Sequence, residues 1–272
     1  MVDSLGHYKV LDRIGAGTLG DVYRARDTRL GRTVAVKLPG PALQDDRARL
    51  DALSADARAA SVLSHPNIAA LYEIGEEGGR VFLVFEFVPG EPLGRVIAGR
   101  PINVRRAVDL ATQMADAFAD AHALGMVHGG LTADTVIVTP KGNAKILDFG
   151  LARWTSRPAP DGADQRADIR ALGRLLFEML TGRQPRSGER IGPSVPAELD
   201  ETVARALDGG YEAAATCAAD LRGVAAILDA RAATSDPVRV VQIRRERPSR
   251  HRVWVVVAIA LVLAALLLYW RS

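Results

Sequence analysis

A glycine-rich hairpin and a lysine on a later strand have the residue types of a phosphate-binding site. Gly15, Gly17 and Gly20 lie in G-A-G-T-L-G between two predicted strands. Lys37 ends the motif V-A-V-K, seventeen residues after Gly20. Glycines let backbone N–H groups approach phosphate oxygens without an intervening Cβ, and an ammonium on a neighbouring strand could reach the same oxygens. The glycines alone would also suit a simple turn, so the prediction depends on the added lysine.

A carboxylate that could hold a metal ion occurs much later in the chain. Asp148 follows the predicted strand A-K-I-L and begins the triplet D-F-G. Oxygen ligands are those that Mg²⁺ prefers, and a bound Mg²⁺ often contacts substrate phosphates as well. Together with the glycines and Lys37, Asp148 predicts a site for a nucleotide and a metal ion.

The elements that must position these residues change character along the chain. Residues 8–38 alternate as three antiparallel strands, and two more strands are predicted around Gly78–Gly79, after an alanine-rich helix at 45–63. Beyond Gly90 the short strands V-I-V-T and A-K-I-L interrupt helices that are expected at about 103–124, 165–181, 198–208 and 213–230. The sequence therefore predicts an α+β fold, with a small antiparallel β lobe at about 8–88 and a larger helical lobe at about 89–230.

Several further motifs follow one another along the chain. They are the glycine loop with Val22, V-A-V-K, H-P-N-I after a helix, F-E-F-V-P-G-E-P-L, G-M-V-H, D-F-G-L-A and D-I-R-A-L-G-R-L-L-F-E-M-L-T-G. On these motifs, residues 8–230 resemble a bacterial-type Ser/Thr protein kinase domain. The resemblance implies a two-lobed kinase fold, which agrees with the order of the predicted elements.

The resemblance also implies a nucleotide site, position by position. Gly15, Gly17, Gly20 and Lys37 would contact the phosphates of ATP, and Asp148 would hold Mg²⁺. The adenine would lie between apolar side chains and bond to the backbone of the segment that links the lobes. The residues for these roles are Val22, Ala35 and Ile137 around the base, Glu86 to Val88 in the linking segment, and Phe85 at the back of the pocket.

Four further positions would shape the site. Asp56 stands where the family has the glutamate that pairs with Lys37; it is one methylene shorter, so either the helix moves inward or the pair lengthens. The resemblance implies that Asp168 anchors the catalytic loop, that His128 packs within that loop, and that Phe149 is structural. A solvent-exposed helix carboxylate is the simpler alternative for Asp56, and a carboxylate at a helix N-terminus is the alternative for Asp168.

The catalytic loop departs from the family pattern. Kinases read H-R-D-L-K-P-x-N, whereas this chain reads H-G-G-L-T-A-D-T from His128 to Thr135. Gly130 replaces the catalytic base and has no group that could accept the proton of a substrate hydroxyl. Thr132 replaces the lysine that faces the phosphate. Thr135 replaces the asparagine of the second Mg²⁺ site, where a neutral hydroxyl is a poorer ligand.

The segments that hold a protein substrate are also reduced. Nineteen residues separate Asp148 from Asp168, without an A-P-E or S-P-E motif, and after Pro185 the chain runs directly into the next helix. We therefore expect a pseudokinase without a catalytic residue, which binds ATP with one Mg²⁺ and regulates or scaffolds another signalling protein or kinase. The alternatives are an active Ser/Thr kinase in which Asp134 or Asp148 replaces the missing carboxylate, and an interaction module that binds no nucleotide.

The C-terminal part of the chain differs in composition. Residues 231–252 contain seven Arg against Asp236 and Glu246, so the net charge of +3 reflects this short segment and does not indicate nucleic-acid binding. Residues 253–270 are uncharged and, at ~1.5 Å per residue, span about 27 Å of a hydrocarbon core of roughly 30 Å. We expect a basic juxtamembrane linker and then a transmembrane helix in the lipid bilayer, because the alternative, a buried core helix, should show some polar face.

Charge also predicts the orientation of this span. Arginines flank its N-terminal side, and the start of the chain has no apolar run that would indicate a signal peptide. We therefore expect a tail-anchored, single-pass protein of the cytoplasmic membrane with its kinase-like domain in the cytoplasm. The lone Cys217, among alanines, is expected to be a small apolar helix residue in a reducing compartment.

Overall fold

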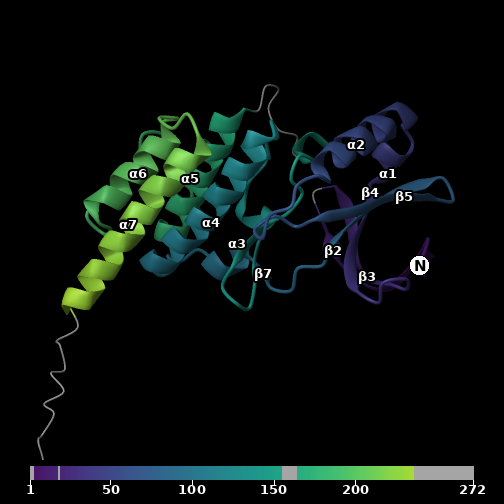
Figure 1. Ribbon diagram of the computed structural model, residues 1–272, viewed down its shortest axis with the longest axis horizontal. Coiled ribbons are helices and arrows are strands. Elements are labelled where there is room, and N and C mark those ends of the chain that lie inside the picture. Colours follow the sequence, from purple (N-terminus) through teal and green to yellow (C-terminus); the bar gives the residue numbers. More distant parts are fainter. Residues whose placement is uncertain (1–2, 18, 155–163, 236–272) are drawn as a thin grey trace, which may run out of the picture. The chain divides into compact units, whose positions relative to one another are not determined.

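A six-stranded antiparallel sheet forms the N-terminal lobe of the computed structural model, which describes residues 3–17, 19–154 and 164–235 (Figure 1). Its strands are β1 (Ser4–Leu5), β2 (Tyr8–Ala16), β3 (Gly20–Asp27), β4 (Thr33–Pro39), β5 (Leu71–Glu77) and β6 (Arg80–Glu86), in the order β1-β2-β3-β4-β6-β5. Successive side chains of a strand point to opposite faces of the sheet, and in the central strands β4 and β6 the side chains on both faces are buried. Val34, Val36 and Val84 belong to one apolar cluster, whereas Ala35 and Leu83 belong to another.

Helix α2 (Arg47–Ala60) packs on the second of these clusters, after the short helix α1 (Pro41–Gln44). It begins where the side chain of Asp46 accepts a hydrogen bond from the backbone N–H of Arg49 at 3.0 Å, which satisfies a free donor of the first turn. Leu50 and Leu53 are buried against the sheet. The helix is shorter at both ends than the expected 45–63 and carries Asp56 towards the other lobe.

The C-terminal lobe is mainly helical. Its elements are β7 (Glu91–Pro92), α3 (Leu93–Ile97), α4 (Val104–Ala123), the 3-10 turn η1 (Ala133–Thr135), β8 (Val136–Val138), β9 (Ala144–Ile146), the 3-10 turn η2 (Ala152–Trp154), α5 (Gln165–Thr181), α6 (Ala197–Leu207) and α7 (Ala214–Ser235). Phe118 on α4 and Phe177 on α5 are fully buried in one core. At Gly173 a Cβ would lie 2.8 Å from the Cβ of Ala206, so a glycine lets α5 and α6 pack closely.

The predicted two-lobed arrangement, with an antiparallel sheet in one lobe and helices in the other, is confirmed. The helices expected at 103–124 and 165–181 correspond closely to α4 and α5. The C-terminal lobe also differs from the expectation. The five-residue helix α3 was not predicted, because so short a segment shows no helical period, and α7 continues to Ser235, five residues past the expected end.

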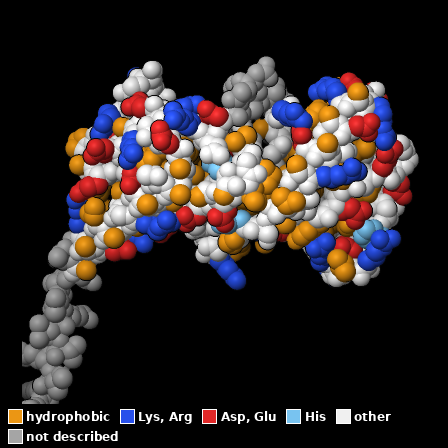
Figure 2. Space-filling view, turned by 45° about the horizontal axis from the view of Figure 1, so that its top comes forward, with side chains coloured by type: hydrophobic (Ala, Val, Ile, Leu, Met, Phe, Trp, Pro, Cys, Tyr) orange, Lys and Arg blue, Asp and Glu red, His pale blue; other side chains and the backbone are white. Residues whose placement is uncertain are grey.

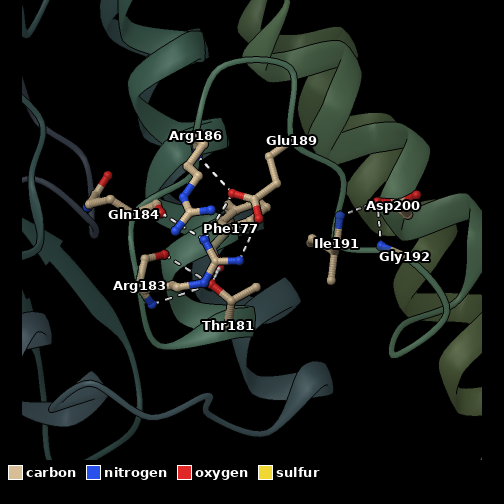
Figure 3. Close-up of polar contacts among 9 residues, drawn as sticks. All are labelled: Phe177, Thr181, Arg183, Gln184, Arg186, Glu189, Ile191, Gly192 and Asp200. Carbon is tan, nitrogen blue, oxygen red and sulfur yellow. Dashed lines mark hydrogen bonds and ion pairs between the residues drawn. The ribbon is translucent and has the colours of Figure 1, made fainter.

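Residues 182–196 link α5 to α6 without a helix, as the sequence predicts (Figure 3). Gly182 ends α5 in the left-handed conformation, with φ of 78°, and a Cβ there would lie 2.6 Å from the carbonyl oxygen of Gly99. A residue with a side chain is therefore excluded at this turn by both conformation and space.

Acidic and basic side chains are interspersed on the face shown in Figure 2, rather than separated into fields of one sign. Among the helices that the structure describes, none is long and apolar enough to cross a bilayer. The predicted span at 253–270 lies outside the described residues, as does the predicted linker from residue 236 onward.

Candidate functional site

The glycine-rich hairpin joins β2 to β3 at the edge of the N-terminal lobe. The backbone N–H of Gly17 donates to the carbonyl oxygen of Gly20 at 2.7 Å, which closes the turn. Gly20 has φ of 153°, and a Cβ there would lie 2.0 Å from the carbonyl oxygen of Leu38, so packing against β4 alone requires this glycine. Gly15 faces open space, with nothing within 4 Å of its added Cβ. The fold thus explains Gly20, whereas the open space at Gly15 leaves room for a ligand.

Lys37 and Asp148 meet between the lobes. The Lys37 ammonium on β4 forms an ion pair with the Asp148 carboxylate, and both side chains are only 7% exposed. The Lys37 Nζ also lies 5.2 Å from the centre of the Phe85 ring. Asp148 has φ of 58°, in the left-handed region that residues other than glycine seldom adopt. Such backbone strain is concentrated at functional sites, and here it aims the carboxylate at the lysine.

Asp56 does not form the predicted pair with Lys37. Its carboxylate instead accepts a hydrogen bond from the indole Nε1 of Trp154 at 2.6 Å and forms an ion pair with Arg153. Both partners lie on or next to η2, which directly follows the D-F-G triplet. The expectation from the resemblance is therefore corrected for Asp56: the turn η2 supplies nearer donors, while the lysine is engaged by Asp148.

The backbone of the catalytic loop is held by Asp168. Its carboxylate accepts hydrogen bonds from the backbone N–H groups of His128 at 2.7 Å and Gly129 at 2.8 Å, and from the ring of His122 at 2.9 Å. The side chain of Asp168 is 1% exposed, which distinguishes it from a surface carboxylate at a helix start. The loop thus keeps its anchor although its catalytic residues are replaced.

His128 lies in the core of this loop. Its Nε2 is 3.0 Å from the carbonyl oxygen of Leu147, and its ring packs edge-on against Phe149 with 5.2 Å between centroids. Burial lowers the pKa of His128, because the interior disfavours the charged imidazolium. A neutral, packed imidazole fits a structural role rather than proton transfer.

Two loop residues that differ from the kinase pattern, Gly130 and Thr135, have close neighbours within the C-terminal lobe. A Cβ at Gly130 would lie 3.0 Å from the Cβ of Ala152 in η2, so the place of a base side chain is crowded. The Thr135 hydroxyl donates to the carbonyl oxygen of Thr132 at 3.0 Å and accepts from its N–H at 2.9 Å. The hydroxyl of Thr135 thus donates and accepts at the start of η1, and as a neutral hydroxyl it is a poorer Mg²⁺ ligand than a carboxylate oxygen.

Asp134, the alternative carboxylate, faces another element. Its Oδ1 is 3.1 Å from the position that a Cβ would take at Gly94 in α3. Its negative charge also contributes, after burial, to raising the pKa of Glu178 on α5. Asp134 thus lies against α3 and near α5.

The residues predicted around the base come from both lobes. Val22, Ala35 and Phe85 share one apolar cluster, and the β4–β6 register sets Ala35 opposite Phe85. Ile137 is half-buried on β8, whereas Val88 is half-buried in the segment after β6. The structure therefore brings Val22, Ala35 and Phe85 together in the N-terminal lobe. Val88 lies in the segment after β6, and Ile137 lies on β8 of the C-terminal lobe.

The sequence did not reveal two contacts near this site. Lys145 on β9 donates to the Glu86 carboxylate at 2.6 Å, which ties the segment between the lobes to the C-terminal lobe. Leu151 is fully buried in the apolar cluster of the N-terminal lobe. In the strand A-K-I-L, the side chain of Lys145 points to the face opposite those of Ala144 and Ile146, and only this alternation could have indicated the first contact. The apolar character of D-F-G-L-A could have indicated the second.

Within the described residues, no group of three His, Cys, Asp or Glu side chains is arranged to hold a metal ion. Asp148 could therefore contribute one carboxylate to an ion whose other ligands come from phosphates and water. This donor set fits Mg²⁺ bound together with a nucleotide better than Mg²⁺ bound alone.

Comparison with known proteins gives a consistent result. The family model described as protein kinase domain matches residues 8–162. The chain is 31% identical over 260 residues to the serine/threonine-protein kinase PrkC of Bacillus subtilis, covering 80% of this chain and 40% of that protein. It is 33% identical over 211 residues to PknA of Mycobacterium tuberculosis, covering 68% and 49%. The chain thus spans half or less of the length of these relatives.

A solved structure shows the same fold. A crystal structure of the Mycobacterium tuberculosis PknI kinase domain superposes with a TM-score of 0.70 at 25% identity, covering 83% of this chain and 99% of that one. The match extends well beyond residue 162, so the helical lobe is included in the likeness.

Proposed function

The chain belongs to the protein kinase family, and on this premise we propose that it is a membrane-anchored pseudokinase that binds ATP and regulates or scaffolds another signalling protein. One observation carries the proposal. The catalytic loop is anchored by Asp168, yet Gly130 offers no base and Ala152 packs where its side chain would begin. An active Ser/Thr kinase needs a carboxylate that orients the substrate hydroxyl.

The nucleotide site retains the groups that would hold phosphates and a metal. Gly15 offers backbone with open space above it, Lys37 supplies an ammonium, and Asp148 supplies a carboxylate. Bound Mg²⁺ would supply positive charge between the phosphates and Asp148. The ammonium of Lys37 would then turn from the carboxylate to the phosphate oxygens.

ATP is expected to stabilise the full chain against thermal unfolding. At 1 mM ATP and a dissociation constant of ~10 μM, binding adds about 2.7 kcal/mol and raises the melting temperature by several degrees. Lys37→Ala should abolish most of this ATP-dependent shift, whatever its own melting temperature. Lys141→Ala removes an exposed lysine in the β8–β9 turn and should keep the shift. A wild-type chain that ATP does not stabilise would instead be an interaction module without nucleotide.

Metal dependence should correspond to one Mg²⁺ per nucleotide, since Asp148 is the remaining charged ligand and the hydroxyl of Thr135 is engaged by Thr132. Titration of Mg²⁺ at fixed ATP, read by the melting temperature, should saturate at a single site. Asp148→Asn should remove the Mg²⁺ effect. Equal ATP affinity with Mg²⁺ and with EDTA would mean that Asp148 serves the turn and the Lys37 pair only.

Attachment to the membrane is proposed through residues 253–270, with the basic residues before them on the cytoplasmic side. The full chain should stay with the membrane in high salt and carbonate and should be released by detergent. Truncation after Ser235, which retains α7, should give a protein that fractionates without membrane. Release of the full chain by carbonate alone would contradict a spanning helix.

A further inference from the structure

A cavity of about 260 Å³ opens on the C-terminal lobe and shares no residue with the predicted ATP site. Its walls come from α5, the loop 182–196 and α6. Three arginines line it, Arg174 from α5 and Arg186 and Arg190 from the loop, together with Ser187 and the apolar side chain of Leu207. The concentration of guanidinium groups in one cavity suggests an anionic ligand.

The loop that forms one wall is held in place by Glu189 (Figure 3). The Glu189 carboxylate accepts from two guanidinium nitrogens of Arg183, at 2.9 and 2.5 Å, and from the backbone N–H of Arg186 at 2.9 Å. These bonds hold the pKa of Glu189 at about 2, so the carboxylate stays ionised and engaged. The loop therefore presents Arg186 from a fixed backbone.

Asp200 on α6 fixes the other end of the loop. Its carboxylate accepts from the backbone N–H groups of Ile191 at 2.8 Å and Gly192 at 3.3 Å, and from the Arg190 guanidinium at 3.0 Å (Figure 3). Arg190 is thus paired. The cavity is built from a loop held at two points, which lowers the entropy that a ligand must remove on binding.

Two of the lining arginines have no such partner. Among the described residues, no carboxylate lies within ion-pair distance, 4.0 Å, of the guanidinium of Arg174 or Arg186. Arg174 is an exposed residue whose guanidinium is partly desolvated, and this desolvation and the positive charge of Arg170, one helical turn away, lower its pKa. Both effects disfavour the charged guanidinium and would be relieved by an anion beside it.

Two carboxylates, those of Glu189 and Asp208, also line the cavity and reduce the net positive charge of its walls. Glu189 is neutralised by Arg183, whereas Asp208 lies exposed at the end of α6. Because Arg190 is paired with Asp200 and Glu189 with Arg183, Arg174 and Arg186 against Asp208 leave a surplus of one positive charge. The groups still able to turn to a ligand are Arg174, Arg186 and the Ser187 hydroxyl. The negative charges near them are those of Asp208 and of Glu189, whose pKa the charge of Arg186 helps to lower.

We propose that this cavity binds a phosphomonoester group. Two guanidinium groups can each form paired hydrogen bonds to phosphate oxygens, and a serine hydroxyl can donate a further one. The side chains of Ala204 and Leu207 line the same space and would contact the carbon skeleton that carries the phosphate. The group could be presented by a phosphorylated serine or threonine of a protein or by a small phosphorylated molecule.

The proposal is tested with a fluorescent peptide that carries one phosphothreonine, the same peptide without phosphate, and inorganic phosphate as a competitor. The full chain in detergent should bind the phosphopeptide only. Arg174→Gln and Arg186→Gln should each weaken binding about tenfold, since each removes a charged hydrogen-bond donor to the phosphate. Arg49→Gln makes the same charge change on the exposed face of α2 and should stay within twofold of the wild type.

The competitor separates the two sources of the group. If inorganic phosphate displaces the phosphopeptide at a concentration similar to that at which the phosphopeptide half-saturates the site, the ligand is a small phosphorylated molecule. If inorganic phosphate fails to displace the phosphopeptide, the ligand is a phosphoprotein. Equal binding of the unphosphorylated peptide would overturn the proposal, as would an equal loss in Arg49→Gln. Unchanged affinity in both cavity variants, or no binding of phosphopeptide or phosphate at 10 mM, would overturn it too.

Discussion

Restoring the two missing groups of the catalytic loop, with Gly130→Asp and Thr135→Asn, is expected to leave phosphoryl transfer to protein substrates close to background. The first reason is local. A Cβ at position 130 would lie 3.0 Å from that of Ala152, so a carboxylate can enter only if η2 moves. The second reason is reduced support for a peptide: residues 182–196 contain no helix, and only nineteen residues separate Asp148 from Asp168.

The magnitudes show which loss matters more. A general base contributes roughly 10²–10⁴-fold, or about 3–5 kcal/mol. Correct positioning of two reactants can contribute roughly 7–11 kcal/mol. Repair at position 130 addresses the smaller of these two effects, so a restored base alone should have little effect on the rate.

The measurement is transfer of radiolabelled phosphate from ATP to a generic basic protein by the wild type, both single variants and the double variant, with Lys37→Ala as the blank. All four should remain within a few-fold of the blank. Robust transfer by the wild type would overturn the pseudokinase proposal and favour an active kinase with an atypical loop. Robust transfer by the repaired chain only would show that a surface able to hold a peptide survives.

Replacing Asp168 with alanine is expected to destabilise the chain by about 3–5 kcal/mol. The carboxylate accepts from the backbone of His128 and Gly129 and from the ring of His122, and it is almost completely buried. Its removal leaves these donors without a partner in the interior. The loss should lower the midpoint of urea unfolding and the melting temperature of the full chain.

A second aspartate on the same helix provides the control. Asp164 caps α5 from an exposed position, where its side chain accepts from the backbone N–H of Ala167 at 2.7 Å. Asp164→Ala should cost about 1 kcal/mol, as is typical of a helix cap. If the two variants lost equal, small amounts of stability, Asp168 would be an ordinary carboxylate at a helix start.

Much of the fold could be predicted because its signals are local. The alternation around Val34 and Val36, the periodicity of α4 and α5, and the turn at Gly78–Gly79 each depend on a few neighbouring residues. The kinase-like order of motifs then placed Lys37 and Asp148 in one site, where the structure brings them together. The absence of a helix after Pro185 followed from the residues there in the same way.

The partners of individual charges could not be predicted because they depend on distant segments. Asp56 and Trp154 are 98 positions apart, and Glu86 and Lys145 are 59 apart. Whether Asp56 meets Lys37 or Trp154 is decided by the path of the chain after Asp148, for which the sequence holds no periodic signal.

If the proposed nucleotide site is correct, the ion pair between Lys37 and Asp148 would make ATP and Mg²⁺ thermodynamically coupled ligands. ATP alone would draw Lys37 away and leave a buried carboxylate facing its phosphates, whereas Mg²⁺ alone would draw Asp148 away and leave a buried ammonium. Each ligand therefore lowers the cost of binding the other, and by linkage the gain in affinity is the same in both directions. Such a site would respond to coincidence, because each ligand would bind more tightly in the presence of the other, and it would report the level of the ATP–Mg²⁺ complex rather than that of either component.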